Sequence, residues 1–256
     1  MEKENINAVV LAGGFGVRTE GILGNLPKAL IETSDGRTIL GHVLSDLKTT
    51  PDLASIVVIT NGKFFEVINK YVSEDNKLKG ILVISDNSKE ATERLGALGD
   101  LLFVLDDNKM KNSEGYLLVL PSDTVYWKAF SIKDFIQYAI RQKDSFVMAV
   151  RRVDNPEIIA NRFGCVVIDN NGKVVDFEEK PEKPKSNFAS SPFYMYDLEK
   201  YKALLTEYKK QGGNLDSPGN FIPFLIKKGI EVSAFIVDNR ITDAGTPEDI
   251  SRAKNY

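Results

Sequence analysis

The chain has 256 residues, 43% of them hydrophobic and 27% charged, and its 33 Lys and Arg against 36 Asp and Glu give a net charge of −3. This composition argues against a disordered or fibrous protein, and the charge balance argues against a nucleic-acid partner. The length suits one large domain, while a single cysteine, Cys165, and a single histidine, His42, exclude an internal disulfide and a zinc cluster.

Strands and helices are predicted to alternate in the first part of the chain. Continuous apolar runs occur at residues 8–12, 56–59, 81–84, 117–120 and 146–150. Runs without polar alternation are typical of strands buried on both faces, and the segments between them have helical periodicity, as at 39–47 and 91–105. This pattern predicts an α/β fold with a Rossmann-like, mixed but mostly parallel sheet flanked by helices, whose ligand crevice lies beyond the carboxyl ends of the strands.

The pattern changes after about residue 155. Two short strands are predicted around a turn at Asn170, Asn171 and Gly172, which is a hairpin signal. A third extended segment follows at about 188–196. We interpret these three segments as a small β-hairpin lobe inserted into the domain.

The remainder of the chain is expected to return to the sheet. A helix at 198–208 is followed by a helix near 221–228 and a strand at 232–237. The last helix begins at Thr246, a favourable N-cap, with Pro247 in its first turn. The predicted single domain therefore has three parts, residues 1–154, 155–197 and 198–256.

Neither a histidine-centred triad nor a membrane segment is expected. His42 lies in an apolar helical stretch, which favours an ordinary histidine on a helix surface over a catalytic one. The N-terminus has no basic region and only a short apolar run, so it is not a secretory signal. No stretch approaches the roughly 18 apolar residues of a membrane span, which predicts a soluble, cytoplasmic protein.

A glycine-rich loop directly follows the first predicted strand, in the sequence LAGGFGVR. Backbone N–H groups in such a loop form a concavity that favours anions, and the cations Arg18 and Lys28 follow to neutralise phosphate charge. The loop is not a P-loop, because no Lys-Ser or Lys-Thr follows its last glycine. It is not a dinucleotide GxGxxG loop either, because Val17, Arg18 and Thr19 follow Gly16.

The pattern LAGGxGxR, nine further residues and then a lysine after a proline resembles the signature of the sugar-1-phosphate nucleotidylyltransferases. The spacing is similar to that of the branch making nucleoside diphosphate hexoses, whereas the loop of the uridylyltransferases acting on N-acetylglucosamine 1-phosphate is shorter. The resemblance implies that the loop wraps a nucleoside triphosphate with Leu11, Ala12, Gly13, Gly14, Gly16, Arg18 and Lys28.

Two aspartates far apart in the sequence are predicted to meet at one site. Asp123 follows the fourth apolar run, and Asp243 lies just before the last helix. Each alone could be a turn or cap residue. The segments SDTVY and DAGTPE, however, resemble the family's two metal-binding motifs, with Ser122 at a position that is usually glycine. The resemblance implies that both carboxylates hold Mg²⁺ together with the triphosphate.

The segment 163–197 resembles the family's sugar-phosphate half over 35 residues. A cation is needed between a phosphate monoester and a triphosphate, because their negative charges repel. Ser191-Pro192 stands where the family usually has Thr-Gly, so the sugar stays open. Taken alone, the Glu-Lys-Pro sequence would simply end an exposed hairpin strand. The resemblance implies four residues that bind the sugar phosphate: Gly164, Glu179, Lys180 and Tyr194.

These motifs imply that a sugar 1-phosphate attacks the α-phosphorus of a nucleoside triphosphate, releasing pyrophosphate and a nucleoside diphosphate sugar. No general base is required, because the attacking phosphate oxygen is already an anion. We expect five catalytic residues: Arg18, Lys28, Asp123, Lys180 and Asp243.

Two other functions stay open at this stage. A catalytically silent sensor of nucleotides or nucleotide sugars would be expected to have lost some of the five charged residues, and all five are present. A glycosyltransferase usually carries a DxD motif, which residues 122–125 lack. The base is also open, because Glu93 either reads an amino group on the base, caps a turn or faces solvent. Relatives commonly form homo-oligomers, and no feature of this sequence decides that point.

Overall fold

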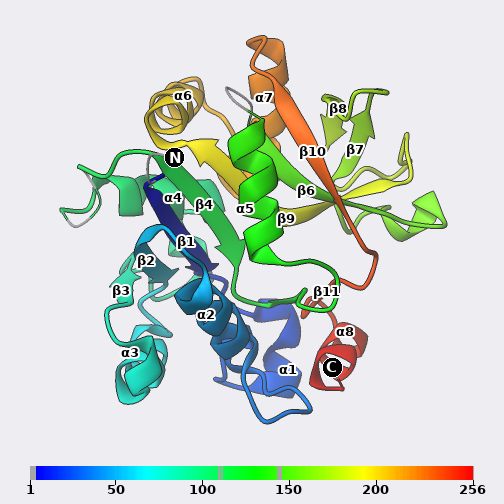
Figure 1. Cartoon of the computed structure of the whole chain (residues 1–256). Helices are drawn as coiled ribbons and strands as arrows, with labels where there is room; N and C mark the ends of the chain where they lie inside the picture. Colours follow the sequence, from blue (N-terminus) through cyan, green and yellow to red (C-terminus); the bar gives the residue numbers. More distant parts are fainter. Residues whose placement is uncertain (1–3, 109, 111, 143–145, 256) are drawn as a thin grey trace.

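The computed structural model describes residues 4–108, 110, 112–142 and 146–255, without the side chain of Arg18. A mixed sheet with strand order β10-β6-β9-β4-β1-β2-β3 runs through the centre, and helices cover both of its faces (Figure 1). Neighbours in this order pair in parallel, except that β9 is antiparallel to both β6 and β4. The strands are β1 (Ile6–Ala12), β2 (Leu53–Thr60), β3 (Leu82–Ser85), β4 (Tyr116–Pro121), β5 (Thr124–Val125), β6 (Phe146–Arg152), β7 (Cys165–Ile168), β8 (Val174–Glu178), β9 (Phe188–Asp197), β10 (Val232–Val237) and β11 (Thr242–Asp243).

The two faces of the sheet are covered by two hydrophobic clusters. Helices α2, α3 and α5 pack on one face, and α4, α6 and α7 pack on the other. In β1, Ala8 and Val10 contact the first cluster and Val9 contacts the second, which explains why the run carries no polar alternation. The helices are α1 (Glu20–Leu23), α2 (Ile39–Thr49), α3 (Phe65–Glu74), α4 (Ala97–Asp106), α5 (Ile132–Arg141), α6 (Leu198–Lys210), α7 (Ile222–Lys227) and α8 (Pro247–Lys254).

The predicted α/β class and the mixed, mostly parallel sheet are confirmed, and one part of the expected lobe lies elsewhere. Strands β7 and β8 form the predicted hairpin, with Gly172 at φ 78° in its turn. Strand β9, expected in the lobe, runs between β6 and β4 in the middle of the sheet. Residues 155–197 are therefore joined to the first part of the chain by strand pairing.

The start of the third long helix differs from the prediction. The helical periodicity suggested a helix from residue 91, but α4 begins at Ala97 and Ala91–Glu93 form a separate 3₁₀ turn. Gly96 lies between them at φ 78°, a left-handed conformation that interrupts the helix. The carboxylate of Glu93 accepts hydrogen bonds from the backbone N–H groups of Lys89 and Glu90, at 2.7 and 3.2 Å. Glu93 therefore caps the start of this 3₁₀ turn, which is one of the three roles expected for it.

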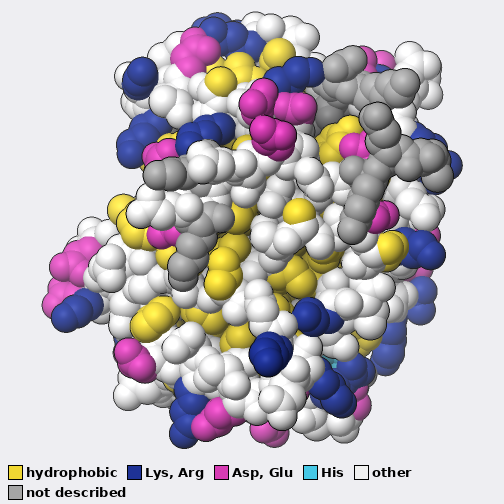
Figure 2. All heavy atoms as spheres, turned by 60° about the vertical axis from the view of Figure 1, so that its left-hand side comes forward, with side chains coloured by type: hydrophobic (Ala, Val, Ile, Leu, Met, Phe, Trp, Pro, Cys, Tyr) yellow, Lys and Arg dark blue, Asp and Glu magenta, His cyan; other side chains and the backbone are white. Residues whose placement is uncertain are grey.

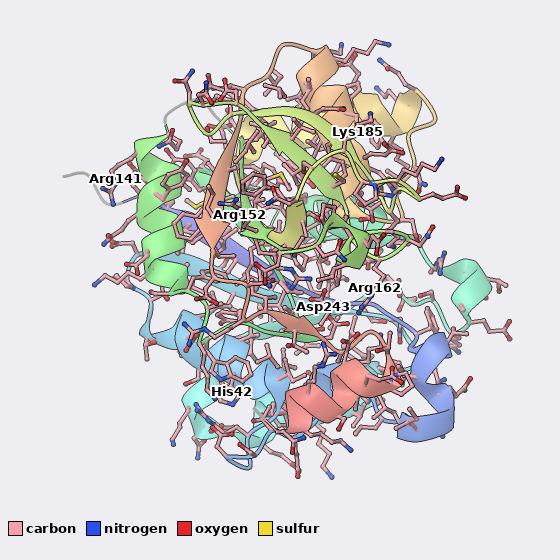
Figure 3. The ribbon with its side chains drawn as sticks, turned by 90° about the vertical axis from the view of Figure 1, so that its right-hand side faces the viewer. His42, Arg141, Arg152, Arg162, Lys185 and Asp243 are labelled. Carbon is pink, nitrogen blue, oxygen red and sulfur yellow. The ribbon has the colours of Figure 1, made fainter. Side chains whose placement is uncertain are left out.

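The prediction of a surface position for His42 was wrong, because its side chain is buried on α2. Its ring stacks on Trp127 with centroids 3.7 Å apart, and Nε2 lies 3.1 Å from Thr33 Oγ1 and 3.2 Å from Asp35 Oδ1. Burial lowers the pKa of His42. The histidine contacts the loop before α2 and is not in the lining of the cavity described below; Figure 3 shows it on a different element from Asp243.

The surface carries charges of both signs. On the face drawn in Figure 2, the described Lys and Arg side chains are interspersed with Asp and Glu and form no continuous basic surface on that face. Among the helices of the described residues, none combines the length and the apolar character that crossing a bilayer requires.

Candidate active site at the carboxyl edge of the sheet

A cavity of about 630 Å³ opens where β1 ends, within the size range of small-molecule sites. It is bordered by the glycine loop, by Lys28 and by the start of α4. Ala12 is buried at the end of β1 and is not part of the lining, and the side chain of Arg18 lies outside the described residues. Five of the residues predicted to bind nucleotide line this cavity: Leu11, Gly13, Gly14, Gly16 and Lys28.

Two glycines of the loop are required for different reasons. Gly16 has φ 68°, and its carbonyl oxygen accepts hydrogen bonds from the backbone N–H and the hydroxyl of Thr19, which close the turn. At Gly13, a methyl group would overlap the Oδ2 atom of Asp100 on α4. The loop therefore lies directly against the Asp100 carboxylate, which would have to move if Gly13 carried a side chain.

Asp123, just before β5, and Asp243, on β11, are brought together by the pairing of these two strands. The short strands β5 and β11 pair antiparallel, with Thr124 opposite Asp243. The Ala244 N–H donates to the Asp123 carbonyl oxygen at 2.9 Å, and Thr124 Oγ1 donates to Asp243 Oδ1 at 2.7 Å. Lys28 Nζ lies 4.0 Å from Asp123 Oδ2, which links this pair to the cavity. The backbone thus places both acids and the lysine at one edge of the sheet.

The donor set at this edge suits Mg²⁺. Carboxylate oxygens are hard ligands, and Mg²⁺ commonly takes one or two of them and completes its shell with water and substrate phosphates. Within the described residues, no group of three or more His, Cys, Asp or Glu side chains is arranged to hold a metal. An ion at Asp123 and Asp243 would therefore need phosphate or water oxygens as its other ligands.

The residues predicted for the sugar phosphate lie around the end of the β7–β8 hairpin. Gly164 packs directly under Phe177, so that a methyl group would overlap the aromatic ring, and its carbonyl accepts from Ser190 N–H at 2.8 Å. Lys180 has φ 49°, and its Nζ lies 3.6 Å from Glu179 Oε1. This turn keeps the ammonium and carboxylate groups together beside the hairpin.

Tyr194 connects the two halves of the site. It lies on β9 and is 3% exposed. Burial raises its pKa first, and the nearby carboxylates of Glu179 and Asp243 raise it further. Tyr194 therefore lies within electrostatic range of one acid from the predicted sugar half and one from the predicted metal pair.

The irregular pairing of β9 explains how the strand accommodates Pro192. The pairing of β6 with β9 shifts register, since Met148 faces Tyr194 and Ala149 faces Ser191. Pro192 falls in this bulge, where its missing N–H interrupts no ladder hydrogen bond.

Arg151 is a buried cation that the sequence analysis did not single out. It is the second-last residue of β6 and is 4% exposed, and its Nη1 donates to the Ile241 carbonyl oxygen at 2.8 Å. Its guanidinium carbon lies 4.4 Å from the centre of the Phe163 ring. Burial lowers the pKa of Arg151, and the Asp243 carboxylate opposes this effect. Arg151 thus joins the hairpin to the segment that carries Asp243.

A second cation, Arg162, holds the helix that follows Asp243. Its Nη2 lies 2.9 Å from Asp249 Oδ2, and Asp249 N–H donates to the Thr246 hydroxyl as the predicted cap of α8. Figure 3 shows Arg162 and Asp243 above α8. The signal in the sequence was weak, because a single arginine in a polar stretch is most often a surface residue.

The fold and this edge define an α/β protein with a glycine loop, a lysine and two aspartates at the carboxyl edge of its sheet. The chain belongs to the nucleotidyl transferase family, whose family model matches residues 7–256. This finding confirms the predicted resemblance.

Named relatives agree on the family. The chain is 26% identical over 262 residues to a glucose-1-phosphate adenylyltransferase of Desulfitobacterium hafniense, covering 99% of this chain and 64% of that protein. It is 28% identical over 254 residues to a protein of the same name from Acetivibrio thermocellus, covering 96% and 58%. The chain thus spans about three fifths of the length of these relatives.

A solved structure has the same fold. A Bacillus anthracis protein assigned as a glucose-1-phosphate thymidylyltransferase, crystallised with a sucrose, superimposes with a TM-score of 0.77 at 22% identity, covering 97% of this chain and 94% of that one.

Proposed function

We propose that this protein is a sugar-1-phosphate nucleotidyltransferase, which joins a nucleoside triphosphate and a sugar 1-phosphate into a nucleoside diphosphate sugar and pyrophosphate. The observation that carries the proposal is the position of Lys28, which lines the glycine-loop cavity and lies 4.0 Å from Asp123, whose carbonyl accepts from the N–H of the residue after Asp243. Its relatives' names support the reaction type. A cytoplasmic location and a homo-oligomeric state are part of the proposal.

The chain's own residues bind and orient the triphosphate and the sugar phosphate. Backbone N–H groups of the glycine loop and the Lys28 ammonium hold the triphosphate. Lys180 holds the sugar phosphate, so that its oxygen faces the α-phosphorus on the side opposite pyrophosphate. Glu179 and Tyr194 contact the sugar. Because the nucleophile is already anionic, alignment and charge neutralisation account for the rate.

Asp123 and Asp243 would hold Mg²⁺ in this scheme. When bound there, the ion supplies positive charge to the phosphate oxygens and so favours the build-up of negative charge during transfer. Thr124, through its hydrogen bond to Asp243, keeps one of these carboxylates oriented toward the site.

Pyrophosphate release tests the proposal. The protein is incubated with Mg²⁺, each of ATP, GTP, CTP, dTTP and UTP, and a panel of hexose 1-phosphates. We expect release with at least one pair of substrates and none without the sugar phosphate. Nucleotide binding with no release for any pair would contradict the proposal and would favour the silent sensor.

Replacing Lys180 by Ala is expected to raise the KM for the sugar 1-phosphate about 10- to 100-fold, as the loss of a charge-assisted hydrogen bond predicts. The KM for the triphosphate should change little. Steady-state kinetics with each substrate varied in turn measures this. Lys183→Ala, an exposed lysine of the same segment, is the matched control. An equal change in both KM values would remove Lys180 from the sugar-phosphate site.

A further inference from the structure

Asp100 is a buried carboxyl group in the wall of the cavity. It lies in the first turn of α4 and is 6% exposed, and among the described residues its Oδ1 has no hydrogen-bond partner. Its other oxygen lies against Gly13. A buried acceptor without a partner costs about 1–3 kcal/mol. A ligand in the cavity that donates a hydrogen bond to Asp100 would recover this cost.

A second acid, Asp86, stands beside Asp100. Asp86 follows β3 and is oriented by Ser88. The Ser88 backbone N–H donates to Asp86 Oδ1 at 2.8 Å, and the Ser88 hydroxyl lies 2.7 Å from Oδ1 and 2.8 Å from Oδ2 of Asp86. Burial first, and the neighbouring Asp86 second, raise the pKa of Asp100 to about 7. A carboxyl group keeps an acceptor oxygen in either protonation state, so Asp100 offers an acceptor to the cavity in both.

The sheet order gives the cavity two chemically different ends. Asp86 follows β3 at the edge strand, whereas Asp123 follows β4 on the other side of β1, near Lys28. A triphosphate carries several negative charges and is repelled by two adjacent acids. The phosphates therefore belong at Lys28 and the later glycines of the loop, and the base belongs beside Gly13, where Asp86 and Asp100 lie.

Resting on the proposed function, we propose that Asp100, which stands beside Asp86, determines which nucleoside triphosphate is used by selecting a base with an exocyclic amino group. Adenine, guanine and cytosine donate an amino N–H that pairs with Asp100 Oδ1. Uracil and thymine present carbonyl oxygens on both sides of one ring N–H, and such an oxygen is repelled when it faces the ionised carboxylate of Asp100. The relatives are named for different bases, so family membership leaves this choice to the residues of the site.

Equilibrium binding of matched triphosphates tests the inference by calorimetry in magnesium buffer. CTP and UTP differ at position 4 by an amino or an oxo group, and ATP and ITP differ in the same way at position 6. GTP and ITP differ by the 2-amino group. We expect the amino member to bind about 10- to 100-fold more tightly in at least one pair.

Asp100→Asn is expected to abolish or reverse this discrimination, because an amide donates a hydrogen bond that an oxo base accepts. Asp216→Asn is the matched control, since Asp216 lines the same cavity but is half exposed and paired with Arg94 at 3.1 Å. It should keep the discrimination of the unaltered protein. Binding of inorganic tripolyphosphate should be the same in both variants and reports that the phosphate end is intact.

Equal affinity for both members of every pair, or unchanged discrimination in Asp100→Asn, overturns the inference. Absence of any nucleotide binding overturns it together with the proposed function. Pyrophosphate release without discrimination overturns this inference alone. Discrimination in binding, with no pyrophosphate release from any pair of substrates, overturns the proposed function alone.

Discussion

Asp243→Asn is expected to lower the rate of pyrophosphate release by about 10²- to 10³-fold, the usual cost of removing one preorganised electrostatic partner. The amide keeps an oxygen that accepts from Thr124 Oγ1, now 2.7 Å from Asp243 Oδ1, so the pairing of β5 with β11 should survive. The loss would then report the missing charge. Steady-state release of pyrophosphate at several magnesium concentrations measures it, and the variant should require more magnesium than the unaltered protein.

Asp123→Asn should have a similar effect, and the double variant should be little worse than either single one. Residues that act as a unit show such non-additive losses. Asp238→Asn, which changes an exposed acid paired with Arg240 in the turn before β11, is the control and should retain full activity. Near-normal turnover of Asp243→Asn at low magnesium would remove that aspartate from the mechanism.

Asp100→Asn is expected to stabilise the folded protein at pH 8 and to have little effect near pH 4. The pKa of Asp100 is about 7 in the folded state against 3.8 as the reference value, so the folded state binds the proton more tightly than the unfolded state. Protonated Asp100 therefore favours folding at low pH. This contribution is lost as the pH rises from about 4 to about 7, and at pH 8 the loss amounts to at most about 4 kcal/mol.

Urea unfolding at pH 4, 6 and 8 measures this difference. The free energy of unfolding of Asp100→Asn relative to the unaltered protein should rise across the series, most steeply between pH 4 and pH 7. Asp216→Asn is measured in parallel, to correct for removing one negative charge from the cavity. A difference between Asp100→Asn and the unaltered protein that is the same at all three pH values would show that Asp100 is not an acid with a raised pKa.

The features that the sequence alone predicted are those that depend on neighbours along the chain. The continuous apolar runs predicted the central strands, because a strand covered on both faces has no polar side to display. Gly172 predicted the hairpin turn and Thr246 the last helix cap, since both depend on the conformation of a few adjacent residues. The glycine loop with its following lysine predicted the family, because that signature is a local spacing of residue types.

The tertiary structure decided the features that depend on residues brought together from distant parts of the chain. The meeting of Asp123 and Asp243 was expected only through the family resemblance, and the pairing of β5 with β11 is what brings their backbones together. Packing of Trp127 on α2 buries His42. Gly13 lies in the glycine loop, Asp86 follows β3 and Asp100 lies on α4. Because their contact depends on three separate elements, no local sequence pattern predicts it. Burial changes the chemistry of such an acid, and burial is a property of the packed fold.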